Sequence, residues 1–483
     1  MIETHCERLS AMDASYLVLE KPHTPLHVSA TLIYEAGPLA TPDGGIDVAA
    51  YRRATEAVLH LIPRYRQKLQ WIPVVGHPVW VDDPEFNLGY HVRHTSLPRP
   101  GTEEQLKRLS ARIMAQPLDH SKPLWEAWVV EGLEGGRFAV ISKIHHCMVD
   151  GMAGRDLAQI LHSTDPAERR TEPAPPWTPR KAPSAAELLA DEVGRYASLP
   201  GRLLRGLGQA RGELGELGRD LATRVGSIRQ TMGSMRELPS QTAINAPVGP
   251  HRRFDWRDMP LGQVKRVRRA LGCTINDLVI ATVTGAVREF LLVRGESLDG
   301  IDFRIAAPVS LRAEGEREMG NRVSQWFVDA PVDEPDVMKR IEKIHAATRA
   351  LKASKQALDV DLIMGIAEWT PTILMSLASR AATGGAPYNL MVTNVPGPQQ
   401  PLYLLGARLE SLYSQVPIAE NTALGIALVS YAGKLCWGFN ADYEAVPDLE
   451  LVADAVERSF AEIAAAVGID LDGSASATDS PTA

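Results

Sequence analysis

Two adjacent histidines followed by an aspartate and a glycine form the most chemically suggestive pattern in the chain. His145 and His146 come at the end of a run rich in β-branched residues, and Asp150 and Gly151 follow after three intervening residues. Histidine suits the role of general base near neutral pH because its ordinary pKa is about 6.5. Since successive side chains of a strand point to opposite faces, one histidine can face a cleft while the other packs inside. The pattern predicts an acid–base site on a loop at a strand end, with Asp150 shaping that loop.

Other reactive side chains are weaker candidates. Cys147 adjoins the histidine pair, but a base that acts directly needs no covalent intermediate, so we interpret this thiol as packing. His91 and His94 are three residues apart, and because no third ligand lies near them in the sequence we expect no metal site. The chain has four cysteines, none of them in a CxxC pair, which indicates a reducing compartment without disulfides or structural zinc.

The elements that must hold these residues follow from periodicity and turn residues. Residues 125–133 and 137–145 are predicted as two strands joined by a glycine-containing turn, and the second strand runs into the histidine pair. Thr274 is predicted as the cap of a long apolar helix over 275–292. Further helices are expected at 49–61, 103–115 and 449–467, and further strands at 301–309, 388–394, 424–431 and 434–441.

Composition breaks divide the chain into four parts. Mixed strands and helices over 1–165 predict an N-terminal domain that carries the histidine motif. Prolines crowd the start of 166–245, which predicts a proline-rich linker followed by an amphipathic helical connector. Residues 246–470 are predicted as a second α/β domain, and the Ser-, Thr- and Ala-rich tail over 471–483 is expected to be disordered.

The helical stretch of the connector, over 185–236, has one apolar face. Apolar residues recur every three or four positions from Leu207 to Met235, with arginines between them. Interspersed glycines weaken such a helix in water, so it needs a surface to pack on. One interpretation packs it against the rest of the protein. The other places it on a membrane or lipid-droplet surface.

Length and charge exclude several classes of protein. A chain of 483 residues with 45% hydrophobic and 23% charged residues is typical of a globular protein with two or three domains. The net charge of −8 gives no overall basic field, so we expect no nucleic-acid partner. No signal peptide and no run of about 18 uncharged apolar residues is visible, which predicts a cytoplasmic protein whose membrane contacts are peripheral.

One local segment departs from this acidic background. Residues 251–269 contain seven Lys or Arg residues against two aspartates. One interpretation is a solvated helix face. The alternative is a site for phosphate groups, with Arg252, Arg253, Lys265 and Arg266 as candidate ligands.

The histidine pattern and a series of other segments resemble the bacterial wax ester synthase/diacylglycerol acyltransferase family, part of the HHxxxDG superfamily of CoA-dependent acyltransferases. Besides His145–Gly151, the segments that carry the resemblance are Leu9–Asp13, Pro123–Glu126, Pro250–Phe254, Thr274–Asp277, Pro308–Arg312, Gly320–Arg322, Thr393–Pro398, Pro401–Ala407 and Ser430–Gly433. They cover nearly the whole chain apart from the connector and the tail. Ser414–Ile418 departs from the family's usual aromatic–proline pattern, which leaves the choice of acceptor open.

The resemblance implies a fold and a set of roles. It implies two chloramphenicol-acetyltransferase-like α/β domains, packed side by side with the histidine motif in a tunnel at their interface. In this arrangement His146 would be the general base, His145 would support it, and Asp150 would hold the loop. Asn276 and Gly151 would contact the substrates, with Asn276 near the acceptor or the thioester oxygen.

The implied reaction moves a long-chain acyl group from acyl-CoA to diacylglycerol or a fatty alcohol, giving triacylglycerol or a wax ester. Acyl-CoA would be a substrate, and no metal or other cofactor is expected. The implied location is the cytoplasm, peripherally associated with membranes or lipid droplets. Two alternatives remain: an acyltransferase of the same superfamily with another acceptor, and a catalytically silent relative that binds lipid surfaces. The intact histidine motif argues against the second.

Overall fold

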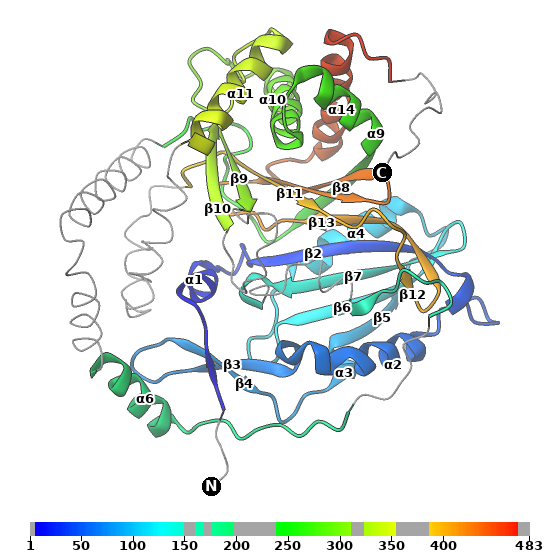
Figure 1. The fold of residues 1–483 in the computed structure, drawn as a ribbon, viewed down its shortest axis with the longest axis vertical. Helices are drawn as coiled ribbons and strands as arrows, with labels where there is room; N and C mark the ends of the chain where they lie inside the picture. The colour runs from blue at the N-terminus through cyan, green and yellow to red at the C-terminus, as the bar shows by residue number, and fades with distance from the viewer. Residues whose placement is uncertain are drawn as a thin grey trace, which may run out of the picture.

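The computed structural model describes residues 5–148, 160–168, 175–197, 238–310, 323–353 and 386–471. In these residues two six-stranded sheets lie one above the other, the N-terminal sheet below and the C-terminal sheet above in Figure 1. Asp150, Gly151, most of the 166–245 connector and nearly all of the 471–483 tail lie outside the described residues.

The N-terminal sheet has the strand order β12-β13-β2-β7-β6-β5. Its strands are β2 (His27–Glu35), β5 (Val92–Ser96), β6 (Trp125–Leu133), β7 (Arg137–His145), β12 (Tyr403–Leu404) and β13 (Ala407–Gln415). The helices of this half are α1 (Ala11–Leu19), α2 (Val48–Val58), α3 (Leu88–His91) and α4 (Glu103–Ala115). The predicted hairpin of β6 and β7 is confirmed, and its turn uses the positive φ angles of Gly135 and Gly136.

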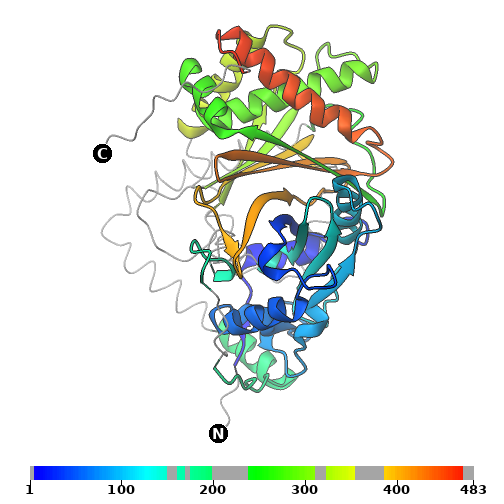
Figure 2. The same cartoon turned by 90° about the vertical axis from the view of Figure 1, so that its right-hand side faces the viewer.

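The C-terminal sheet has the order β10-β9-β11-β14-β15-β8. Its strands are β8 (Arg252–Pro260), β9 (Arg304–Ser310), β10 (Val323–Asp329), β11 (Leu390–Pro396), β14 (Leu424–Tyr431) and β15 (Lys434–Asp442). Helices α9 (Leu261–Leu271), α10 (Ile275–Val293), α11 (Val337–Ala353) and α14 (Leu449–Ala466) cover its outer face (Figures 1 and 2). Together they enclose a large apolar core that includes Val283, Phe290 and Val456.

Two strands from late in the chain complete the N-terminal sheet. β13 pairs antiparallel with β2, and β12 continues that edge. Beyond β13 the two sheets meet closely, because a Cβ at Gly438 of β15 would lie 2.1 Å from the carbonyl oxygen of Ser414. Trp256 of β8 stacks on Tyr413 with ring centroids 4.7 Å apart. The N-terminal sheet is thus completed by two strands from the 246–470 segment, and the predicted domain boundaries stay a prediction.

A small sheet and one helix lie at the far end of the N-terminal half. The sheet has the order β1-β4-β3, from β1 (Glu7–Arg8), β3 (Gln67–Trp71) and β4 (Pro78–Asp82). Helix α6 (Ala185–Ala197), the described start of the predicted amphipathic stretch, buries Leu188 in a cluster with Ile72 and Val79. Arg8 also pairs with Glu192 of α6 at 2.6 Å. This first part of the stretch therefore packs against the protein.

No single helix of the described residues is long and apolar enough to cross a membrane. Helices α9 and α10 reach that length and apolar composition only as a pair, and they are bent by 97° at the break between them.

Candidate active site

The histidine pair lies where β7 ends. β7 finishes at His145, and a short 3₁₀ turn, η4 (His146–Met148), begins at His146. The His145 N–H donates to the carbonyl of Leu124 at 3.0 Å, and the His146 N–H donates to that of Leu26 at 2.9 Å. The His145 side chain is fully buried, whereas His146 is half-buried. The two side chains thus have different surroundings, as the sequence predicts.

The His146 ring packs face to face against helix α1. Its centroid lies 4.0 Å from that of Tyr16, with the planes 27° apart. Its Nδ1 atom is buried without a hydrogen-bond partner among the described residues. Burial, with a smaller contribution from His145, lowers the pKa of His146 to about 4. The imidazole is therefore neutral at pH 7, and a neutral imidazole has the lone pair that a general base needs.

The pH profile tests this protonation state. Because protonation removes the lone pair, kcat/KM is expected to fall as pH drops through about 4, the pKa of His146, and to stay flat above roughly pH 5.5. The lowered pKa also means that the unfolded chain takes up this proton more readily, so stability falls with pH from about 6.5 to about 4. Circular dichroism at each pH separates unfolding from titration. An acid limb centred near the ordinary histidine pKa of about 6.5 would contradict the assignment.

His145 faces away from His146 and toward a carboxylate. Its Nε2 atom lies 3.5 Å from Oε1 of Glu20, the residue that ends α1. On the other side of the ring, Nδ1 accepts the backbone N–H of Cys147 at 3.2 Å. Burial raises the pKa of the Cys147 thiol well above its ordinary value, which supports the interpretation of this cysteine as packing rather than nucleophile.

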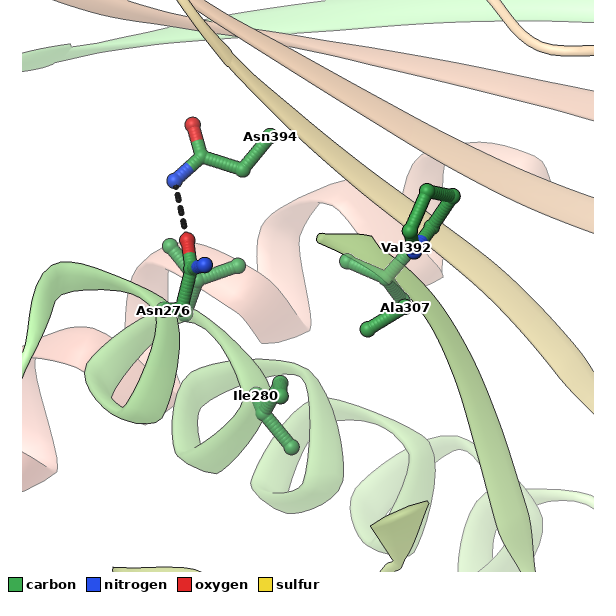
Figure 3. Close-up of a pocket in the computed structure, with 7 residues that line it drawn as sticks. Asn276, Ile280, Ala307, Val392 and Asn394 are labelled. Atoms are coloured by element: carbon green, nitrogen blue, oxygen red, sulfur yellow. Dashed lines mark hydrogen bonds between the residues drawn. The ribbon is translucent and has the colours of Figure 1, made fainter. Parts of the chain in front are cut away.

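The C-terminal half contributes a small pocket around Asn276. Thr274 and Asp277 form a capping box at the start of α10, which fixes the first turn that carries Asn276. Asn394, on β11, donates its Nδ2 to Oδ1 of Asn276 at 2.7 Å (Figure 3). The pocket has an empty volume of about 230 Å³ and is lined by Asn276, Val279, Ile280, Ala307, Pro308, Val392 and Asn394. Since Oδ1 of Asn276 is occupied, its amide nitrogen is the atom placed to donate to a ligand.

The pocket and the histidine pair have separate neighbours. Asn276 contacts Asn394 of its own half, and His146 contacts Tyr16 of the N-terminal half. The interface tunnel that the resemblance implies therefore stays a prediction.

Arg252 is a poor candidate for a phosphate ligand. Its side chain is buried, and its guanidinium donates to the carbonyls of Gly249, His251 and His23. Asp442 lies 3.9 Å away on the same side. A guanidinium that donates to backbone carbonyls joins segments of the fold, so these contacts favour a structural role for Arg252 over the alternative of phosphate binding.

The other three basic candidates lie on two different elements. Arg253 lies over the ring of Tyr443 at 3.9 Å, near the start of β8. Lys265 and Arg266 are exposed on α9, which begins after β8 ends. Because a strand rises about 3.3 Å per residue, Arg253 lies roughly 25 Å from the residue at which α9 starts. Of the four candidate phosphate ligands, Lys265 and Arg266 are the two that lie on the same helix.

The geometry of His91 and His94 does not favour a shared metal site. His91 is buried, and its Nδ1 donates to the carbonyl of Trp125 at 2.8 Å. His94 is instead paired with Glu131 at 3.2 Å. The two rings have separate partners and do not converge on a common point.

Sequence reasoning missed four residues around the histidine pair. They are Tyr16, Glu20, His27 and His120, and each contacts His145 or His146, or the carboxylate beside His145. The available signal was a cap-like Ser10 followed by Asp13, which predicts a helix start, and the alternation of polar and apolar residues in 27–35. Those patterns predict a helix and a strand, but they do not indicate that both elements lie beside the end of β7.

Comparisons with known proteins agree on one family. A model described as the wax ester synthase/diacylglycerol acyltransferase catalytic domain matches residues 9–279, and one described as the WS/DGAT C-terminal domain matches residues 319–464. The probable diacylglycerol O-acyltransferase tgs1 of Mycobacterium tuberculosis H37Rv is 31% identical over 474 residues, which cover 95% of this chain and 96% of the relative. A putative diacylglycerol O-acyltransferase of M. tuberculosis CDC 1551, MT3172, is 33% identical over 478 residues, with coverages of 95% and 97%.

Solved structures confirm the fold predicted from the resemblance. The wax ester synthase/diacylglycerol acyltransferase from Marinobacter aquaeolei VT8 matches with a TM-score of 0.66 and 24% identity, covering 96% of this chain and all of the other. The first condensation domain of the calcium-dependent antibiotic synthetase matches with a TM-score of 0.59 and 17% identity, with coverages of 95% and 96%. At these identities the likeness concerns the fold.

Proposed function

Because this chain belongs to the wax ester synthase/diacylglycerol acyltransferase family, we propose that it transfers a long-chain acyl group from acyl-CoA to diacylglycerol or a fatty alcohol. The products are triacylglycerol or a wax ester. The family supports the reaction class, an acyltransferase, and the names of the mycobacterial relatives support diacylglycerol as an acceptor. The observation that carries the mechanism is the neutral imidazole of His146 at a strand end.

In the proposed mechanism His146 accepts the hydroxyl proton of the acceptor, and Asn276 donates a hydrogen bond to a reacting oxygen. The acceptor hydroxyl gives its proton to His146 while its oxygen bonds to the thioester carbonyl carbon. The resulting oxyanion, or the acceptor hydroxyl itself, takes a hydrogen bond from the amide nitrogen of Asn276. Collapse of this intermediate breaks the carbon–sulfur bond, and the imidazolium of His146 protonates the leaving CoA thiolate. Acyl-CoA is a substrate, and this sequence of steps uses no other cofactor.

The acceptor is tested with a panel of alcohols. Purified protein is incubated with palmitoyl-CoA and, separately, diacylglycerol, monoacylglycerol, hexadecanol and short alcohols, and the products are identified by mass spectrometry. Triacylglycerol or hexadecyl palmitate is the expected product. Transfer only to a non-lipid acceptor such as a sugar would favour another member of the superfamily, and no transfer to any acceptor would favour a lipid-binding relative.

For the CoA phosphates we retain Lys265 and Arg266 as proposed contacts. Both are exposed cations on α9, and neither forms an ion pair with a carboxylate of the described residues. Arg253 is less suited, because its guanidinium lies over Tyr443 and its Nε donates to the carbonyl of that residue at 3.1 Å.

We also propose peripheral attachment to a membrane or lipid droplet, since both proposed substrates are amphiphiles. The support is the apolar, arginine-flanked pattern of 198–236, which lies outside the described residues and continues from α6. Wild type is expected to co-sediment with anionic vesicles and to dissociate as salt screens the attraction. Replacing Leu214, Leu217 and Leu221 by Asp should release the protein while leaving its melting temperature unchanged. If wild type never co-sediments, or if the triple variant unfolds, the stretch packs on the protein instead.

A further inference from the structure

Three histidine rings surround one largely buried carboxylate beside the histidine pair. Oε2 of Glu20 lies 2.9 Å from Nε2 of His120, and Oε1 lies 3.5 Å from Nε2 of both His27 and His145. The side chains of His27 and His145 are completely buried, whereas His120 is 37% exposed. The four residues come from the end of α1, from β2, from the segment before β6 and from β7. The cluster therefore joins four separate segments at the point where β7 ends.

The hydrogen bonds of His145 decide where its proton lies. Its Nδ1 atom accepts the backbone N–H of Cys147 at 3.2 Å and therefore carries a lone pair. A neutral imidazole then carries its proton on Nε2, the atom that faces Glu20. Ligand atoms of Glu20, His120 and His145 all lie within 4.8 Å of one another, as in a metal site. A histidine that binds metal through Nε2 would need its proton on Nδ1, so the geometry favours a proton donor at His145.

The charges of the cluster are consistent with this arrangement. Burial opposes ionisation of Glu20, but His120, with Nε2 at 2.9 Å, and His145, with Nε2 at 3.5 Å, hold the pKa of its carboxyl well below the ordinary value. The hydrogen bond with Glu20 raises the pKa of His120, whereas burial lowers the pKa of His27 well below its usual range. Glu20 is thus an anion at neutral pH, the raised pKa of His120 favours its protonated form, and His27 is neutral.

We propose that Glu20 is a positioning residue that holds the η4 turn, which carries His146, in place through His145. The ring of His145 connects the carboxylate of Glu20 on one side with the backbone of Cys147, the residue after His146, on the other. One turn before Glu20, the same helix supplies Tyr16, which stacks on His146. The end of α1 therefore contacts both members of the pair. This inference rests on the proposed role of His146 as the base.

The direct test is Glu20→Gln. A glutamine keeps the shape of the side chain, but its NH₂ group must face one of the imidazole N–H donors that the carboxylate now accepts. We expect kcat to fall about 10- to 100-fold through misplacement of the η4 turn, with little change in KM. The matched control is Glu131→Gln, which alters a carboxylate paired with His94 at 3.2 Å in β5. The control should keep wild-type kcat.

A double-mutant cycle shows whether Glu20 acts through His145. In a His145→Ala background, Glu20→Gln should cause no further loss of kcat, because the connection is already absent. Independent losses that multiply would overturn the proposal, as would wild-type kcat in Glu20→Gln. If Glu20→Gln does not fold, Glu20→Asp is used in the same double-mutant cycle. It keeps the negative charge, but its shorter side chain moves the carboxylate away from the His145 ring.

A readout without turnover separates this proposal from the proposed function. Nitrogen-15 chemical shifts of the His145 ring in the wild-type protein should show the proton on Nε2, and Glu20→Gln should reduce that preference. A proton on Nδ1, or shifts that change on adding zinc, would overturn the proposal even if the enzyme is active. If the shifts agree but no acceptor is acylated, the proposed function fails and the positioning contact stands.

Discussion

Replacing His146 by alanine is expected to lower kcat/KM by about a thousandfold or more while the protein stays folded. The substitution removes the group that takes the hydroxyl proton and returns it to the thiolate, and general acid–base catalysis is worth about 10²–10⁴-fold. The ring is half-buried against Tyr16, so a modest loss of packing accompanies it. Steady-state rates with palmitoyl-CoA and circular dichroism melting curves measure the two effects.

His94→Ala and His145→Ala are the controls for this result. His94 is 39% exposed and pairs with Glu131, so its replacement should leave turnover unchanged. His145 does not take the substrate proton in this scheme, so its replacement should cost less than that of His146. Turnover close to wild type in His146→Ala would show that another group is the base.

Replacing Asn276 by aspartate is expected to lower kcat/KM about a hundredfold. The substitution keeps an oxygen that can accept from Asn394, but a carboxylate replaces the free amide donor and repels a developing oxyanion. A loss confined to kcat would place the donor at the thioester oxygen, whereas a raised KM for the alcohol would place it at the acceptor. Unchanged kinetics would exclude both roles.

Asn87→Asp is the matched control for this change. Asn87 is exposed and caps α3 by accepting the N–H of Gly89 at 2.8 Å. Aspartate caps a helix about as well as asparagine, so the same chemical replacement there should leave both stability and activity unchanged.

Local patterns predicted the elements that carry the site. The alternation of apolar and polar residues, the β-branched residues and the glycine turn predict β6 and β7 with the bounds that the structure has. The capping signal at Thr274 predicts the start of α10. The histidine pair was placed correctly at a strand end for the same reason. These features depend on contacts within one segment or between neighbours in the sequence, which is why the sequence alone specifies them.

Contacts between distant segments were not predictable in this way. Nothing local indicates that β13 leaves its own half of the chain to pair with β2, because its apolar alternation fits either sheet. Glu20 and His145 are brought together only when the end of α1 meets the end of β7. Arg252 looked like part of a basic cluster because charge counting does not reveal that its guanidinium donates to buried carbonyls.

Direct transfer of the acyl group from CoA to a lipid hydroxyl couples CoA release to product formation. This coupling is measured by following free CoA thiol and lipid product together, with palmitoyl-CoA in the presence and absence of diacylglycerol or hexadecanol. We predict that CoA is released only when an acceptor is present and in equal amount to the triacylglycerol or wax ester formed. Stoichiometric CoA release without acceptor, with an acyl group left on the protein, would contradict this account.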